Sequence, residues 1–141
     1  MQKTTIMILA IFMALWVMGC ANNSSTTTST GQIIEEVTVT EAYNLIQDNS
    51  DKAAFFILDV RTPSEFASGH IEGSILIDFN ASNFRTEVDK LDKSKRYLVY
   101  CRTSNRSGQA VSIMKDLGFK EVYDVDGGIV AWEAAGLPIV T

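Results

Sequence analysis

Short apolar runs alternate with amphipathic stretches from Ile33 onward, and this alternation constrains the fold more than any other feature of the sequence. The apolar runs predict five strands, at residues 37–39, 55–58, 75–77, 97–100 and 122–125. The stretches between them predict helices at residues 40–47, 64–67, 83–88 and 128–135, with another that ends at Gly118. Strands that alternate with helices form a parallel sheet, and right-handed crossovers place helices on both of its faces. The sequence therefore predicts an α/β domain with about five parallel strands.

Three residues mark the predicted helix ends. Thr40 is expected to cap the helix after the first strand, because a threonine hydroxyl accepts a hydrogen bond from an N–H of the first turn. Pro63 suits the first turn of a helix, where its missing N–H costs nothing. Gly118 is expected to end the helix after the fourth strand.

The first 32 residues differ in composition from the rest of the chain. Lys3 precedes an almost unbroken apolar run at residues 6–19, and Cys20 follows it. Such a start is typical of a secretory signal peptide, and the run is shorter than the roughly 18–20 residues of a membrane-spanning helix. Residues 17–20 (VMGC) also resemble the bacterial lipobox, in which the cysteine is acylated and becomes the first mature residue.

We therefore expect residues 1–19 to be a lipoprotein signal peptide and Cys20 to carry the lipid. Residues 20–32, rich in Ser and Thr, are then a flexible tether, and residues 33–141 form the domain. This organisation places the domain outside the cytoplasm, anchored to a bacterial membrane on its periplasmic or cell-surface side. A plain signal peptide cut elsewhere, or an uncleaved anchor, is the alternative.

The composition argues against several function classes. The formal net charge is -5 and no basic run is present, so the clustered Lys and Arg that nucleic acid requires are missing. The only histidine, His70, and one free cysteine fall short of the three or four ligands of a metal site. A lone Gly127-Gly128 pair is too little for a nucleotide-binding loop, and no C-x-x-C redox motif occurs. We expect no nucleic-acid partner, no metal and no cofactor.

Cys101 is the strongest candidate for chemistry. Acylation of Cys20 would leave it as the only free thiol, although a disulfide between the two is the other interpretation of a cysteine pair. It follows a predicted strand and precedes the first turn of a helix, whose N–H groups and positive dipole end favour the thiolate, as do Arg102 and Arg106. A buried core cysteine explains the apolar strand but not these two arginines. We therefore predict a nucleophile.

Three groups of residues in the predicted domain carry motifs of a known family. They are residues 59–66 (DVRTPSEF) with 69–74 (GHIEGS), residues 101–107 (CRTSNRS), and residues 127–132 (GGIVAW) with 136–139 (GLPI). Together, and in this order, they resemble the rhodanese family of sulfurtransferases. The resemblance covers nearly all of residues 33–141 and implies a rhodanese-like fold.

The resemblance also implies a two-step reaction at Cys101. The cysteine takes the outer sulfur of a donor such as thiosulfate, becomes a persulfide, and passes the sulfur to a thiol or another nucleophile. The loop residues that would cradle this sulfur through their backbone amides are Arg102, Thr103, Ser104, Asn105 and Arg106. The side chains of Arg102 and Arg106 would attract the anionic donor. Many members have glycine where Ser104 lies; if that position needs a positive φ, serine costs roughly 1 kcal/mol more.

Other polar and aromatic residues near this edge are expected to be structural. Asp59 and Arg61 end a strand, and we interpret them as an ion pair or loop hydrogen bonds that support the active loop. His70 opens a strand and matches a structural position of the family rather than a catalytic base. Phe66 and Trp132 are expected in the core or in the pocket wall.

Loop length separates this prediction from the nearest rival enzymes. Cysteine phosphatases and arsenate reductases need C-x5-R, whereas here Arg106 is five residues after Cys101 and Ser107 is six after it. The predicted function is thus a sulfurtransferase whose partners are a small sulfur donor, a thiol acceptor and, through the lipid, a membrane. The alternative is a non-enzymatic module of the same fold that binds persulfides or senses redox state.

Overall fold

The structure, a computed structural model, describes residues 31–49 and 53–141. The predicted signal peptide, Cys20 and all but the last two residues of the predicted tether lie outside the described residues. Within the described ranges, no helix is long and apolar enough to cross a membrane.

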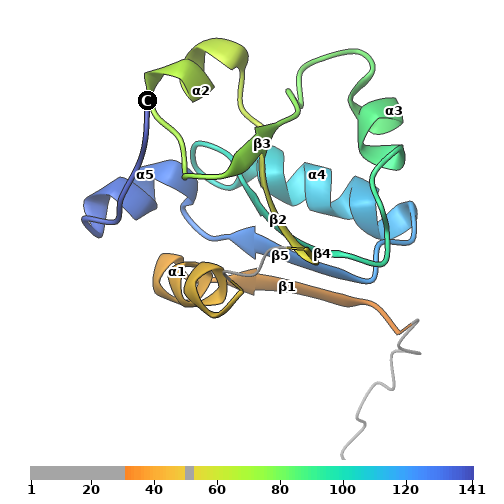
Figure 1. The fold of residues 1–141 in the computed structure, drawn as a ribbon. Coiled ribbons are helices and arrows are strands. Elements are labelled where there is room, and N and C mark those ends of the chain that lie inside the picture. The colour runs from red at the N-terminus through yellow and green to blue at the C-terminus, as the bar shows by residue number, and fades with distance from the viewer. Residues whose placement is uncertain (1–30, 50–52) are drawn as a thin grey trace, which may run out of the picture.

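Five strands alternate with five helices along the described part of the chain (Figure 1). The strands are β1 (Ile33–Val37), β2 (Phe55–Asp59), β3 (Ser74–Leu76), β4 (Arg96–Tyr100) and β5 (Glu121–Val125). The helices are α1 (Val39–Asp48), α2 (Pro63–Ser68), α3 (Phe84–Asp89), α4 (Asn105–Asp116) and α5 (Gly128–Ala134). The sheet has the order β1-β5-β4-β2-β3 and all neighbouring strands are parallel, which confirms the predicted fold class.

Helices cover both faces of this sheet (Figure 1). One core lies under α3 and α4 and includes Met114, and the other lies under α1 and α5 and includes Trp132. Successive residues of a strand face opposite sides of a sheet. Consequently Tyr100 belongs to the core on the α1 and α5 side, while the next residue, Cys101, belongs to the core on the α4 side.

The carboxyl ends of β2, β4 and β5 meet at one edge because these strands are close neighbours in a parallel sheet. The connections that leave them lead into α2, α4 and α5. α2 buries none of its residues in the core and lies over this edge (Figure 1). Open α/β sheets place their sites here, beyond the carboxyl ends of the strands.

The prediction for the first strand was wrong in its boundaries, and the predicted cap of the helix after it was wrong as well. β1 ends at Val37, where the predicted strand was expected to begin, and α1 starts at Val39. Its cap is Thr38 rather than Thr40, because Thr38 and Glu41 form a capping box: the Thr38 hydroxyl accepts from the Glu41 N–H at 3.3 Å, and Glu41 accepts from the Thr38 N–H at 2.8 Å. Every other predicted boundary agrees with the structure to within one residue, including Pro63 as the first residue of α2. Gly118, with φ 89°, directly follows the C-cap Leu117 and ends α4 as predicted.

Candidate active site

Cys101 lies where the sequence predicts, at the end of the central strand β4 and four residues before α4 begins. Its thiol is free, and the residue is only 1% exposed. The first turn of a helix leaves backbone N–H groups unpaired and carries a partial positive charge. Cys101 therefore sits beside an N-terminus that favours an anionic sulfur.

The first turn of α5 fixes the backbone of this loop. The carbonyl of Cys101 accepts a hydrogen bond from the Ile129 N–H at 2.9 Å, and the carbonyl of Arg102 accepts one from the Val130 N–H at 3.2 Å. Gly128 allows this approach, because a Cβ there would lie 2.5 Å from the Cys101 carbonyl oxygen. The position of the cysteine thus depends on α5 as well as on its own strand.

Ser104 has a left-handed backbone, with φ 76° and ψ −19°, and is the only non-glycine residue with positive φ in the described ranges. This position therefore has the positive φ at which serine is expected to cost more than glycine. Its hydroxyl accepts a hydrogen bond from the Gly127 N–H at 2.6 Å and donates to the Val125 carbonyl at 3.4 Å. A glycine would relieve the strain but lose both bonds, so the serine ties the loop to the turn between β5 and α5.

Arg106 forms a bidentate ion pair with Glu65 of α2, with N–O distances of 2.8 and 2.7 Å. Glu65 also accepts hydrogen bonds from the backbone N–H and the hydroxyl of Thr62, the cap of α2. The bond from Arg106 is the main reason why the pKa of Glu65 is lowered to about 2. Glu65 also raises the pKa of Arg106, with a smaller contribution from Cys101. Arg106, predicted as a donor-binding side chain, therefore joins the active loop to α2.

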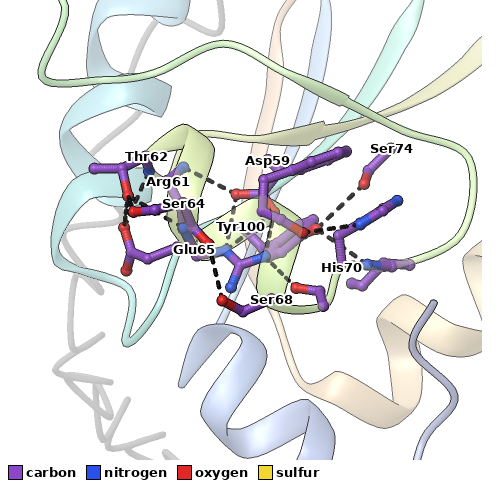
Figure 2. Close-up of polar contacts among 12 residues, drawn as sticks. Asp59, Arg61, Thr62, Ser64, Glu65, Ser68, His70, Ser74 and Tyr100 are labelled. Carbon is purple, nitrogen blue, oxygen red and sulfur yellow. Dashed lines mark hydrogen bonds and ion pairs between the residues drawn. The ribbon is translucent and has the colours of Figure 1, made fainter. Parts of the chain in front are cut away.

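Asp59 and Arg61 form the predicted ion pair, which is buried at the end of β2 (Figure 2). The guanidinium reaches the carboxylate at 2.6 and 3.0 Å, and the backbone N–H of Arg61 donates to the same carboxylate at 2.9 Å. Arg61 also donates to the Gly69 carbonyl at 2.7 Å, and its Cζ lies 5.6 Å from the centre of the Tyr100 ring. The pair connects β2 with the segment that follows α2.

Tyr100 adds a second connection across this edge (Figure 2). Its hydroxyl accepts from the Ile71 N–H at 3.1 Å and lies 3.2 Å from the Ser74 hydroxyl. Burial, followed by the charge of Asp59, raises the pKa of Tyr100, so its hydroxyl stays protonated. Sequence reasoning missed this residue, although its place one position before Cys101 assigns it to the opposite face.

His70 occupies a structural position. Its ring stacks on Phe66 with centroids 3.8 Å apart, and its Nδ1 lies 3.0 Å from the Phe66 carbonyl oxygen. Its backbone pairs with Val140 through two hydrogen bonds of 2.8 and 2.9 Å.

Trp132 is buried and donates to the Pro138 carbonyl at 2.9 Å. No group of three or more potential metal ligands occurs within the described residues.

A cavity of about 260 Å³ opens beside the active loop. Its lining comes from α2 and its flanks, from the loop and from α5: Arg61, Glu65, Ser68, Gly69, Arg102, Ile129, Val130 and Glu133. Arg102, next to the buried thiol, is exposed. The predicted loop residues Thr103 and Asn105 are exposed as well, and α4 starts at Asn105. The cavity thus borders the Cys101 loop at Arg102.

Comparisons with known proteins agree with this geometry. A family model described as the rhodanese-like domain matches residues 38–135. A sulfurtransferase of Allochromatium vinosum is 32% identical over 100 residues, which cover 71% of this chain and 92% of that protein. Thiosulfate sulfurtransferase 16, chloroplastic, of Arabidopsis thaliana is 33% identical over 117 residues, 76% of this chain and 93% of that protein. The crystal structure of a rhodanese-related protein from Thermoplasma volcanium superposes with a TM-score of 0.65 at 35% identity and covers 75% of this chain and 97% of its own.

Proposed function

Because this chain belongs to the rhodanese-like domain family, we propose that it is a sulfurtransferase that moves sulfane sulfur through a persulfide on Cys101. The donor is thiosulfate or a related compound, as the name of the Arabidopsis relative suggests, and the acceptor is a thiol or another nucleophile. One observation carries the proposal: a free thiol follows the central strand directly and lies in the short loop that leads into α4.

The proposed reaction has two displacement steps. The Cys101 thiolate attacks the outer sulfur of thiosulfate, a new S–S bond forms, and sulfite leaves with the electron pair of the bond that breaks. The proton of an acceptor thiol then moves to the outer sulfur of the Cys101 persulfide anion, and the resulting acceptor thiolate attacks that sulfur. The acceptor becomes a persulfide, and Cys101 returns as a thiolate. No cofactor or oxidant is needed for this balance.

The loop supports these steps through charge and backbone geometry. The N–H groups near the start of α4 suit a bound anionic sulfur. Arg102 is exposed at the cavity and, among the described residues, forms no ion pair, so its charge is available to an anionic donor. Arg106 is paired with Glu65 and acts mainly by holding the loop.

Two features weigh against the alternatives. The loop places its arginine five residues after Cys101, and this arginine is held by Glu65 rather than directed at a tetrahedral oxyanion. This disfavours a phosphatase. Against the non-enzymatic module, the cavity beside Arg102 gives a small donor an approach to the loop that holds the buried Cys101.

We also propose that the domain is a lipoprotein anchored through Cys20. The support is in the sequence: Lys3, the apolar run at residues 6–19 and the lipobox-like residues 17–20. The anchor and the sulfur chemistry rest on separate parts of the chain and are tested separately.

Intact-mass measurement tests the sulfur chemistry most directly. Purified full-length protein incubated with thiosulfate should gain one sulfur, about 32 Da, and release one sulfite, as persulfide formation requires. The gain should map to Cys101 and be absent in Cys101→Ser. An unchanged mass without sulfite would overturn the proposal.

A further inference from the structure

The charged residues that line the cavity beside the active loop fall into two groups. Arg61 is paired with Asp59, and Glu65 is paired with Arg106, so both charges are already compensated. Arg102 and Glu133 are exposed, and neither forms an ion pair with any described residue. The cavity therefore offers one available positive charge and one available negative charge.

The two charges come from different elements. Arg102 follows Cys101 in the active loop, and Glu133 lies near the end of α5. Val130, which is 44% exposed, also lines the cavity, and its N–H donates to the Arg102 carbonyl at 3.2 Å. A ligand that satisfies all three has an anionic group, a cationic group and a short apolar part.

The volume of the cavity limits the size of this ligand. At about 260 Å³ it is smaller than the roughly 300–1,000 Å³ of pockets for drug-sized ligands. Its lining is also mostly polar or charged. These features fit a small polar metabolite rather than a large hydrophobic one or a folded protein.

Resting on the proposed sulfur transfer, we infer that the acceptor is a small zwitterionic aminothiol, an α-amino acid thiol such as cysteine. Its carboxylate binds Arg102, its ammonium group binds Glu133, and its methylene group contacts Val130. The thiolate attacks the outer sulfur of the Cys101 persulfide, the S–S bond to Cys101 breaks, and the acceptor leaves as an amino acid persulfide. Glu133 is thus a specificity-determining residue.

The same carboxylate has the opposite effect on the donor. Thiosulfate is a dianion, so Glu133 repels it while Arg102 attracts it. Removal of the Glu133 charge should therefore help loading of Cys101 and impair its discharge to an aminothiol. A purely structural role for Glu133 would not split the two half-reactions in this way.

The experiment compares the two half-reactions in full-length wild type and Glu133→Gln. The control is Asp116→Asn, which removes one exposed negative charge at the C-terminal end of α4, away from the Cys101 loop. Protein loaded with thiosulfate is separated from it and mixed with L-cysteine, cysteamine or 3-mercaptopropionate. The first has both charged groups, the second lacks the carboxylate and the third lacks the ammonium group. The loss of about 32 Da gives the discharge rate constant for each acceptor.

Glu133→Gln should slow discharge to cysteine and cysteamine about 1.5- to 5-fold, the range of an exposed ion pair, and should speed discharge to 3-mercaptopropionate. Loading by thiosulfate should become faster, and 1 M salt should reduce all of these differences. Asp116→Asn should behave like wild type.

An equal change for all three acceptors, or no change for cysteine, would overturn the inference while leaving sulfur transfer intact. A wild type that forms no persulfide with any sulfane-sulfur donor would refute the proposed function, and this inference with it.

Discussion

Arg106 and Glu65, which are 41 residues apart in the sequence, hold the active loop and α2 together through two parallel hydrogen bonds. Glu65 is at the same time the capping-box partner of Thr62. One carboxylate thus fixes the start of a helix and the position of the loop. The helix end and the reactive loop therefore cannot shift independently.

This ion pair should contribute measurably to stability. In a double-mutant cycle with Glu65→Gln and Arg106→Gln, the coupling energy from urea unfolding should be about 1 kcal/mol, because the two side chains are only 26% and 20% exposed. The matched control is Glu87 with Lys90, which are 40% and 63% exposed and should couple by less than about 0.5 kcal/mol. Equal coupling in the two cycles would contradict this prediction.

Asp124 should make the folded state less stable as the pH rises. Burial, as the main cause, raises the pKa of Asp124 to about 6, and its Oδ1 is buried without a hydrogen-bond partner in the described structure. The unfolded chain loses this proton near 3.8 and the folded chain near 6, so the folded state binds more protons in that window. Stability is lost as the pH rises through it.

Asp124→Asn removes this titration and should be more stable than wild type at pH 7, by about 1–3 kcal/mol. The difference should shrink between pH 6 and pH 4. Urea unfolding of both proteins at several pH values is the measurement. A difference that does not depend on pH would show that Asp124 is not the group that titrates.

Ser104 offers a test of backbone strain against hydrogen bonding. Ser104→Ala keeps the positive φ and loses both hydroxyl bonds, so it should cost about 1–2 kcal/mol. Ser104→Gly loses the same bonds but relieves about 1 kcal/mol of strain, and should stay within about 1 kcal/mol of wild type. Urea midpoints at constant slope give both values. The account fails if glycine destabilises as much as alanine does.

The proposed lipid anchor predicts a change in processing when Cys20 is substituted. Full-length protein expressed in a bacterium should sediment with membranes and incorporate a labelled fatty acid, because two or more acyl chains hold a protein stably to a bilayer. Cys20→Ser should abolish the label, whereas Cys101→Ser, the control, should keep it. Labelling that persists in Cys20→Ser would refute the anchor.

The sequence predicted most of the fold because the buried strands are strongly apolar. It failed at β1, whose residues (IIEEV) lie at the sheet edge and are mostly exposed, so that the pattern of a buried strand is absent. The Thr38 and Glu41 capping box was readable, and so was that of Thr62 and Glu65.

The position of Cys101 between a strand end and a helix start, with two arginines nearby, was predictable because these are local features. Contacts between distant segments were not. The Arg106 pair with Glu65 and the Ser104 bond to Gly127 join residues 41 and 23 positions apart, and no sequence periodicity links them. Glu133 was missed for the same reason, because only folding brings the end of α5 to the cavity.

The burial of Cys101 would also protect this thiol in the oxidising environment that the proposed lipid anchor implies. A disulfide with a second protein requires the two sulfur atoms to approach to about 2 Å, which a residue 1% exposed prevents. A persulfide extends the chain by one S–S bond and moves the reactive atom about 2 Å farther from the backbone. In the proposed reaction, the unmodified thiol is thereby shielded from crosslinking, while the persulfide presents its outer sulfur to a small acceptor.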